Sequence, residues 1–216
     1  MTDAADVADL EAGRRLFAGE CRFVAGADQI ESLPPSGPPE IAFAGRSNVG
    51  KSSLVNALTG RTTLARISRT PGRTQQLNFF DLGGRLALVD MPGFGYANVA
   101  KTKIKQWNGL IERYLRGRQS LRRVCLLIDS RHGIMAVDCG FMERLDAAAV
   151  SYQVVLTKSD KVPADELRQR TSGLAAELAQ HPAAHPAIIA TSAEDGRGIP
   201  DLRAALAMLA QPARFD

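Results

Sequence analysis

Residues 45–52 carry the pattern GxxxxGK[ST], whose residue types and spacing suit the binding of phosphate groups. The pattern follows an apolar strand signal and precedes a helical one, so backbone N–H groups and the positive end of the helix can face the phosphates. Lys51 reaches the outer phosphates, and the Ser52 hydroxyl binds Mg²⁺. The predicted phosphate-binding residues are Gly45, Arg46, Ser47, Asn48, Val49, Gly50, Lys51 and Ser52.

A second motif, Asp90-Met91-Pro92-Gly93, ends the apolar run at residues 86–89. A carboxylate at the tip of a buried strand beside a phosphate loop is suited to placing Mg²⁺ without bonding it directly. Gly93 leaves its N–H free for the terminal phosphate. Taken alone, such a sequence is also an ordinary turn at a strand end. Its position after the phosphate-binding pattern favours the functional interpretation.

A third motif, Thr157-Lys158-Ser159-Asp160, ends the apolar run at residues 154–156 and selects the base. The Asp160 carboxylate can accept bonds from the N1–H and the exocyclic amine of guanine, and adenine has no such pair of donors. The Lys158 stem can pack on the ring. Two charge-assisted hydrogen bonds of about 1.5–3 kcal/mol each favour guanine by about 10²–10⁴-fold. The motif therefore predicts GTP rather than ATP.

The weakest of these signals is Thr191-Ser192-Ala193, which follows the last strand pattern. We expect a backbone N–H near Ala193 to meet the guanine O6. A kinase with the same phosphate loop is an alternative. However, the sequence shows no second substrate pocket or lid, and the Lys158/Asp160 pair is typical of GTPases.

The elements that must position these motifs alternate along the chain. Short apolar runs predict strands, and periodic stretches between them predict helices. Such alternation implies crossover connections and an α/β fold, with a mostly parallel central sheet covered by helices on both faces. Ligands of such sheets bind beyond the carboxyl ends of the strands, where the motifs lie. The expected strands are residues 41–44, 74–80, 86–89, 124–128, 153–156 and 187–190, and the expected helices are 52–58, 101–115, 137–150, 164–178 and 199–209.

The composition is that of one globular domain, because 45% of the 216 residues are hydrophobic and 23% are charged. No apolar run approaches the roughly 18 residues that span a bilayer, and the N-terminus carries acid where a secretory signal carries base. We expect a cytoplasmic protein with buried free thiols at Cys21, Cys125 and Cys139. The expected organisation is an acidic, partly disordered segment with a Pro-rich linker over residues 1–39, a GTPase domain over 40–210 and a short tail over 211–216.

The order of the motifs resembles that of the TrmE-Era-EngA-EngB group of translation-factor-related GTPases. Three longer runs are similar to one family, the EngB (YihA/YsxC) ribosome-biogenesis GTP-binding proteins. The resemblance covers about residues 20–210 and implies a P-loop, Ras-like GTPase domain that acts in assembly of the large ribosomal subunit, and in cell division and septation. The runs are GRSNVGKSSLVNAL at 45–58, TPGRTQQLNFF at 70–80 and DMPGFGYA at 90–97.

The resemblance also assigns a switch-loop threonine. Thr74 is implied to join Ser52 on Mg²⁺ when GTP is bound, and Thr70 is the alternative assignment. The residues implied to act in hydrolysis are Lys51, Thr74 and Gly93. The nucleotide-binding residues implied in this loop are Gly72, Arg73, Thr74, Gln75 and Gln76.

Two residues bear on the rate of hydrolysis. Phe94 stands after the DxxG motif, where many GTPases have a glutamine that orients the attacking water. Hydrolysis is therefore expected to be slow without help. Asn48 stands where related GTPases use an asparagine to hold K⁺ against the phosphates, and such a charge is worth about 10³–10⁵-fold in rate. Our hypothesis is that Asn48 binds K⁺, and the alternative is that it only braces the loop.

Two basic clusters flank the segments that should respond to the terminal phosphate, on a chain of net charge +4. We expect them to contact ribosomal RNA of the large subunit or its precursor, with no membrane partner and a monomeric protein. A solvated helix face is the alternative. Trp107 and Tyr114 are expected in the core rather than as base-stacking platforms. The clusters are Lys101, Lys103, Lys105, Arg113, Arg116, Arg118, Arg122 and Arg123, and Arg61, Arg66, Arg69 and Arg73.

Two functions from different classes fit these residues. The first is a switch enzyme that uses GTP and Mg²⁺ and hydrolyses GTP by positioning and charge stabilisation, since no side chain is an obvious general base. The second is a guanine-nucleotide-sensing scaffold that binds RNA or the ribosome with negligible turnover. Phe94 favours the second, and substantial turnover stimulated by a partner would favour the first.

Overall fold

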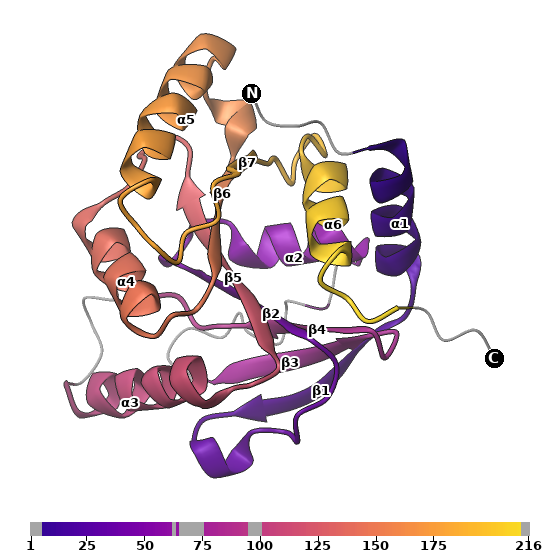
Figure 1. Ribbon diagram of the computed structural model, residues 1–216, viewed down its shortest axis with the longest axis vertical. Coiled ribbons are helices and arrows are strands. Elements are labelled where there is room, and N and C mark those ends of the chain that lie inside the picture. The colour runs from indigo at the N-terminus through magenta and orange to yellow at the C-terminus, as the bar shows by residue number, and fades with distance from the viewer. Residues whose placement is uncertain (1–5, 62–63, 65–75, 95–100, 213–216) are drawn as a thin grey trace.

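The computed structural model describes residues 6–61, 64, 76–94 and 101–212, with only the backbone of residues 101–106. Their core is one seven-stranded sheet with strand order β1-β3-β4-β2-β5-β6-β7 (Figure 1). β3 pairs antiparallel with both β1 and β4, and all other neighbours are parallel. The strands are β1 Cys21–Ala27, β2 Glu40–Gly45, β3 Leu77–Leu82, β4 Leu86–Asp90, β5 Leu121–Asp129, β6 Tyr152–Thr157 and β7 Ile189–Ala190.

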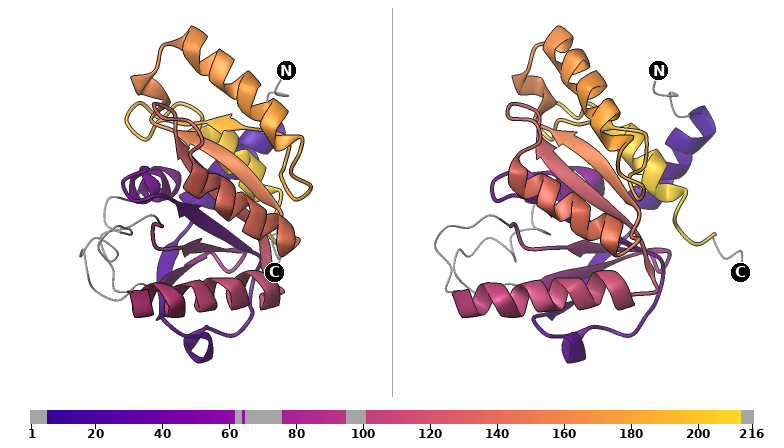
Figure 2. Two further views of the ribbon diagram at one scale, coloured as in Figure 1. Left: turned by 90° about the vertical axis from the view of Figure 1, so that its left-hand side faces the viewer. Right: turned by 60° about the vertical axis from the view of Figure 1, so that its left-hand side comes forward.

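Helices cover both faces of this sheet (Figure 2). Buried side chains of α3, α4 and α5 pack on one face, and those of α1, α2 and α6 pack on the other. The mostly parallel α/β architecture expected from the sequence is confirmed. The helices are α1 Val7–Ala18, α2 Lys51–Thr59, α3 Lys101–Gly117, α4 Ala136–Ala147, α5 Ala164–Leu178 and α6 Ile199–Ala207, with short 3₁₀ turns η1 Ile30–Ser32 and η3 Ser159–Lys161.

The strands and helices expected from apolar patterns are present after residue 40, with differences at their ends. The strand expected over residues 74–80 runs over Leu77–Leu82, and its first two expected residues lie outside the described part. α4 ends at Ala147 rather than at Val150, because Ala149 has a positive φ of 51° that a helix does not allow. The strand expected over 187–190 is reduced to Ile189–Ala190.

The N-terminal part of the chain differs from the expectation of an acidic segment before a fold that begins at residue 40. β1 adds an edge strand to the sheet through β3, and α1 packs against α6. Only Gly13, Leu16 and Phe17 of α1 are buried, while Arg14 and Arg15 are exposed. An apolar stripe of so few residues gives little indication of a helix in the sequence. At the C-terminal end, Gln211 of the expected tail is bonded to the fold, because its N–H donates to the Arg85 carbonyl.

Two further expectations concern single side chains. All three cysteines are free thiols, and Cys21 and Cys125 are buried, as expected. Cys139 is only half-buried, so the expected burial is wrong for this residue. Tyr114 is fully buried and Trp107 packs against the same core, which confirms their assignment to the interior. Among the described residues, no helix has the length and apolar character needed to cross a membrane.

Gly13 marks the closest approach of α1 to α6. A Cβ at this position would lie 2.6 Å from the backbone nitrogen of Ala204. Gly13→Ala should therefore lower the free energy of unfolding by about 1–3 kcal/mol, because the helices must separate. Gly173→Ala in α5 is the matched control, since a Cβ added there would meet no atom within 4 Å beyond its chain neighbours and the backbone of its own helix. It should raise stability by about 0.5–1 kcal/mol. Urea denaturation measures both, and equal stability of the two variants would contradict the close packing.

Candidate functional site

The phosphate loop leaves the centre of the sheet, because β2 lies between β4 and β5 and is buried along its whole length. Asn48 and Gly50 adopt positive φ angles of 62° and 102°. These left-handed residues turn the backbone sharply, and α2 then begins at Lys51. Val49 is buried between them and anchors the turn. The loop therefore turns at the positive end of α2, which suits the binding of phosphate groups.

The end of β4 closes against this loop. The Phe94 N–H donates to the Gly45 carbonyl, and the Ser47 N–H donates to the Phe94 carbonyl, each at 3.2 Å. A Cβ on Gly93 would lie 3.0 Å from the Ser47 nitrogen, so any larger residue would push the two segments apart. The Phe94 ring stacks on Phe141 of α4 with a centroid distance of 4.9 Å. It is therefore part of the core packing.

Lys51 and Asp90 form an ion pair at the centre of the site, where the adjacent ends of β2 and β4 meet. Both side chains are at least nine-tenths buried. Ser52 follows Lys51 in the first turn of α2. The described residues hold no group of three or more His, Cys, Asp or Glu side chains that could bind a metal by themselves. Mg²⁺ fits this donor set, because it prefers one or two protein oxygens together with phosphate oxygens and water.

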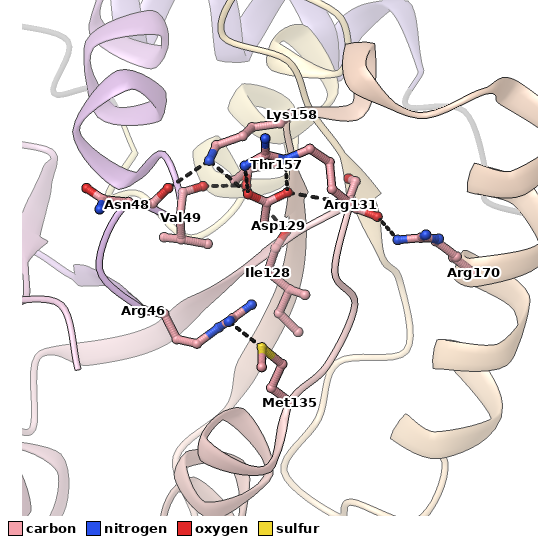
Figure 3. Close-up of polar contacts among 11 residues, drawn as sticks. Arg46, Asn48, Val49, Ile128, Asp129, Arg131, Met135, Thr157, Lys158 and Arg170 are labelled. Atoms are coloured by element: carbon pink, nitrogen blue, oxygen red, sulfur yellow. Dashed lines mark hydrogen bonds and ion pairs between the residues drawn. The ribbon is translucent and has the colours of Figure 1, made fainter. Parts of the chain in front are cut away.

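The expected guanine motif lies at the end of β6 and is bonded to the phosphate loop (Figure 3). The Thr157 hydroxyl donates to the Val49 carbonyl at 2.6 Å, and the Lys158 ammonium donates to the Asn48 carbonyl at 2.7 Å. Lys158 itself has a positive φ of 56°, which directs its side chain back over the loop. The segments expected to hold the base and the phosphates therefore form one connected unit.

Asp160 lies at the mouth of this unit with its carboxylate 2.9 Å from the Lys161 ammonium. The hydrogen bonds from Lys161 and then from Ser192 hold the pKa of Asp160 below its ordinary value, so the carboxylate is ionised at neutral pH. The Ser159 N–H donates to the Thr191 carbonyl at 3.1 Å, which brings the segment after β7 beside the motif. A pocket of about 520 Å³ extends from Asp160 and Ala193 along α2.

Comparisons with known proteins agree with this geometry. The model of a family described as "50S ribosome-binding GTPase" matches residues 40–158. A "Probable GTP-binding protein EngB" of Rhodopseudomonas palustris is 56% identical over 211 residues, covering 97% of this chain and 98% of the relative. One of the same name from Rhodospirillum rubrum is 59% identical over 208 residues, covering 94% and 90%. The chain belongs to the EngB family of GTP-binding proteins.

A solved structure of a "probable GTP-binding protein engB" is similar as well, with a TM-score of 0.61 and 25% identity. The similarity covers 78% of this chain and 98% of that one. The α/β fold described above is therefore the P-loop GTPase fold of the EngB family. The resemblance inferred from the sequence motifs is confirmed.

The structure brings most of the predicted site residues together, from residues 45–52, 90–93, 157–160 and 191–193. The switch-loop residues Gly72, Arg73, Thr74 and Gln75, and the alternative Thr70, lie outside the described residues, so their roles stay predictions. Gln76 is described, and its amide donates to the Asn78 side chain at 2.9 Å, beside β1. No contact of Gln76 with the phosphate loop is seen among the described residues.

Sequence reasoning missed Asp129, the last residue of β5, which accepts a hydrogen bond from Lys158 at 2.8 Å. It also missed Asp138, a fully buried carboxylate in α4 that lies 3.2 Å from the guanidinium of Arg46. The signal for Asp129 was available, since it ends an apolar strand as Asp90 does. The signal for Asp138 was not, because nothing near it in the sequence points to the phosphate loop.

In the structure, the basic cluster at residues 101–123 has fewer exposed arginines than the sequence predicted. Arg118 is mostly buried and donates to Glu40 and to the Pro34 carbonyl. Arg123 is half-buried and donates to Gln153 at 3.1 Å. These two arginines stabilise the fold and do not form part of an open basic face. Arg113, Arg116 and Arg122 are exposed, as is Arg61 of the other cluster, whereas the side chains of Lys101, Lys103 and Lys105, and all of Arg66, Arg69 and Arg73, lie outside the described residues.

Proposed function

We propose that this chain is a GTP-dependent switch in assembly of the large ribosomal subunit, which hydrolyses GTP slowly by itself. The observation that carries the proposal is the direct bonding of the guanine motif to the phosphate loop through Thr157 and Lys158. One rigid unit can thereby read both the base and the phosphates. The match to a 50S ribosome-binding GTPase model supports the ribosome as partner. By the family resemblance, the proposal extends to cell division and septation.

The residues of the site favour catalysis by positioning and charge. Lys51 exchanges its bond with Asp90 for the outer phosphate oxygens when nucleotide binds, and Gly93 directs its N–H to the terminal phosphate. Ser52 would hold Mg²⁺, together with Thr74 in our assignment, and Asp90 would place the ion. The ion would neutralise the charge that develops on the phosphates. Because the Phe94 ring packs on Phe141, it does not orient a water molecule, and slow intrinsic turnover follows.

Asn48 is the candidate for binding K⁺. Asn48 is exposed at the rim of the phosphate loop. Its left-handed backbone favours asparagine over most residues, and this preference also fits the alternative that Asn48 only braces the loop. The two roles predict different salt effects. If Asn48 binds K⁺, wild-type turnover should be at least about 10-fold faster in KCl than in NaCl. Asn48→Ala and Asn48→Gly, which tolerates the positive φ, should both lose that ratio. A variant that slows turnover but keeps the wild-type ratio would refute the K⁺ role.

The proposed contact with ribosomal RNA rests on exposed arginines near the C-terminal half of α3 and the start of β5. Arg113, Arg116 and Arg122 are exposed, although Arg116 also lies 3.3 Å from Glu112. Each arginine that neutralises an RNA phosphate releases counterions, so binding should weaken as salt is raised. The alternative, a scaffold with negligible turnover, is favoured only by Phe94.

Sedimentation with large ribosomal subunits tests the proposal. We expect binding with a non-hydrolysable GTP analogue, weaker binding with GDP and a loss of binding as salt is raised from about 50 to 200 mM. Arg113→Ala/Arg116→Ala/Arg122→Ala should bind less well, whereas Arg168→Ala, which removes an exposed arginine of α5, is the matched control. Equal binding in all nucleotide states, without turnover stimulated by subunits, would support the scaffold instead.

A further inference from the structure

Asp129 is a buried carboxylate at the carboxyl end of β5, and none of the motifs contains it. It is only 4% exposed and is surrounded by donors. Arg131 donates through its backbone N–H at 3.0 Å and through its guanidinium at 3.0 and 2.8 Å. Lys158 donates through its ammonium at 2.8 Å. Burial raises the pKa of Asp129, but the bonds from Arg131 and Lys158 outweigh it and hold the pKa well below its ordinary value. The carboxylate is therefore ionised.

Lys158 is held between two acceptors. Its ammonium donates to the Asn48 carbonyl at 2.7 Å and to the Asp129 carboxylate at 2.8 Å (Figure 3). Its left-handed backbone, with φ 56° and ψ 37°, fixes the start of the same side chain. A lysine has four side-chain torsions, so an exposed lysine loses considerable entropy when it is ordered. Because both ends of this side chain are fixed, that entropy is lost before any base arrives.

The end of β5 is itself fixed in place. The Ser130 N–H donates to the Thr157 carbonyl at 2.9 Å, which joins the residue after Asp129 to the residue before Lys158. The Ser130 carbonyl accepts a hydrogen bond from Arg170 of α5. Asp129 therefore has a defined position relative to the guanine motif, and its contact with Lys158 does not depend on a mobile loop.

We infer that Asp129 is a positioning residue for nucleotide binding, which holds Lys158 so that its stem lies over one face of the guanine ring. The inference rests on the proposed role of Lys158 at the base. Asp129 does not touch the nucleotide in this assignment and acts only through the lysine. The Arg131 guanidinium bonds both oxygens of the carboxylate and helps to keep it ionised, and it shares Oδ2 with the Lys158 ammonium.

The test measures release of fluorescently labelled GDP in stopped-flow experiments on the full chain. Asp129→Asn keeps the shape of the side chain but removes its charge, and it should speed GDP release by about 10- to 100-fold. Lys158→Met keeps the apolar stem but removes the ammonium, and it should have a similar effect. The double variant Asp129→Asn/Lys158→Met should release GDP no faster than Lys158→Met alone, because the carboxylate acts through the ammonium.

Two controls separate this role from a general effect on folding. Asp165→Asn removes an exposed carboxylate of α5 and should leave GDP release unchanged. Inosine diphosphate lacks the exocyclic amine that Asp160 would bind in GDP. Asp129→Asn should lower the affinity for both nucleotides by the same factor, because the substitution leaves the bond between that amine and Asp160 unchanged. Unchanged GDP release in Asp129→Asn, or additive effects in the double variant, would overturn the inference while leaving the proposed function intact. A wild-type protein that does not bind GDP would instead overturn the proposed function.

Discussion

Asp160→Asn is expected to lower the affinity for GTP by about 10²–10⁴-fold and to create affinity for xanthosine triphosphate. The carboxylate of Asp160 accepts from both N1–H and the exocyclic amine of guanine in the proposed complex. An amide can accept only one of these bonds, and its N–H group then faces the amine. Xanthine carries a carbonyl in place of that amine, so the amide donates to it. Competition binding with GTP and xanthosine triphosphate measures the change.

The environment of Asp160 supplies a control and a pH dependence. Lys161→Ala removes the ion partner but leaves the carboxylate ionised at neutral pH, so GTP affinity should change by only a few-fold. Because the pKa of Asp160 lies below its ordinary value, the carboxylate is still ionised at pH 5. GTP affinity should therefore vary little through this group between pH 8 and pH 5. An Asp160→Asn variant that keeps wild-type selectivity for GTP would contradict the role of this residue.

Lys51→Met is expected to weaken binding of GTP by about 10²–10⁴-fold, because two charge-assisted bonds to phosphate are lost. The change also leaves the Asp90 carboxylate buried without its ion partner, at a cost of about 3–5 kcal/mol to the nucleotide-free protein. Thermal unfolding with and without GTP and Mg²⁺ measures both effects. The melting temperature of the wild type should rise with nucleotide, whereas that of the variant should be lower and should not rise.

A second variant separates binding from stability. Lys51→Met/Asp90→Asn replaces the unpaired carboxylate by a neutral amide, so its nucleotide-free stability should recover towards that of the wild type. Its nucleotide binding should stay weak, because the lysine is still absent. If Lys51→Met shows the same nucleotide-dependent rise in melting temperature as the wild type, the assigned role of Lys51 is wrong.

The sequence was sufficient to predict those features that depend on neighbouring residues. The phosphate loop, the DxxG turn and the guanine motif each consist of a few consecutive residues at a strand end. The periods of apolar residues predicted most strands and helices after residue 40 and, through their alternation, a mostly parallel sheet. Three longer runs around the motifs, at residues 45–58, 70–80 and 90–97, also indicated the EngB family, which the comparisons confirm.

Tertiary structure decided which polar groups meet across the chain. From the sequence, Arg118 was expected to be an exposed basic residue near the end of a helix. In the structure it pairs with Glu40, 78 residues away, because β2 and the end of α3 lie together. Asp129 and Lys158 are 29 residues apart and meet because β5 and β6 are parallel neighbours. Such pairings depend on strand order, which the local pattern of apolar residues does not contain.

The N-terminal elements show the same limit. β1 lies at the sheet edge and has exposed apolar side chains, Phe23 and Val24, and α1 buries only a few residues against α6. β1 and α1 are stabilised by packing on distant parts of the chain, so their own residues give little indication of their secondary structure. The sequence by itself thus determined the chemistry of the motifs, because each motif is local. Only the tertiary structure decided how the motifs are linked and which charges are free, because those contacts join residues far apart in the chain.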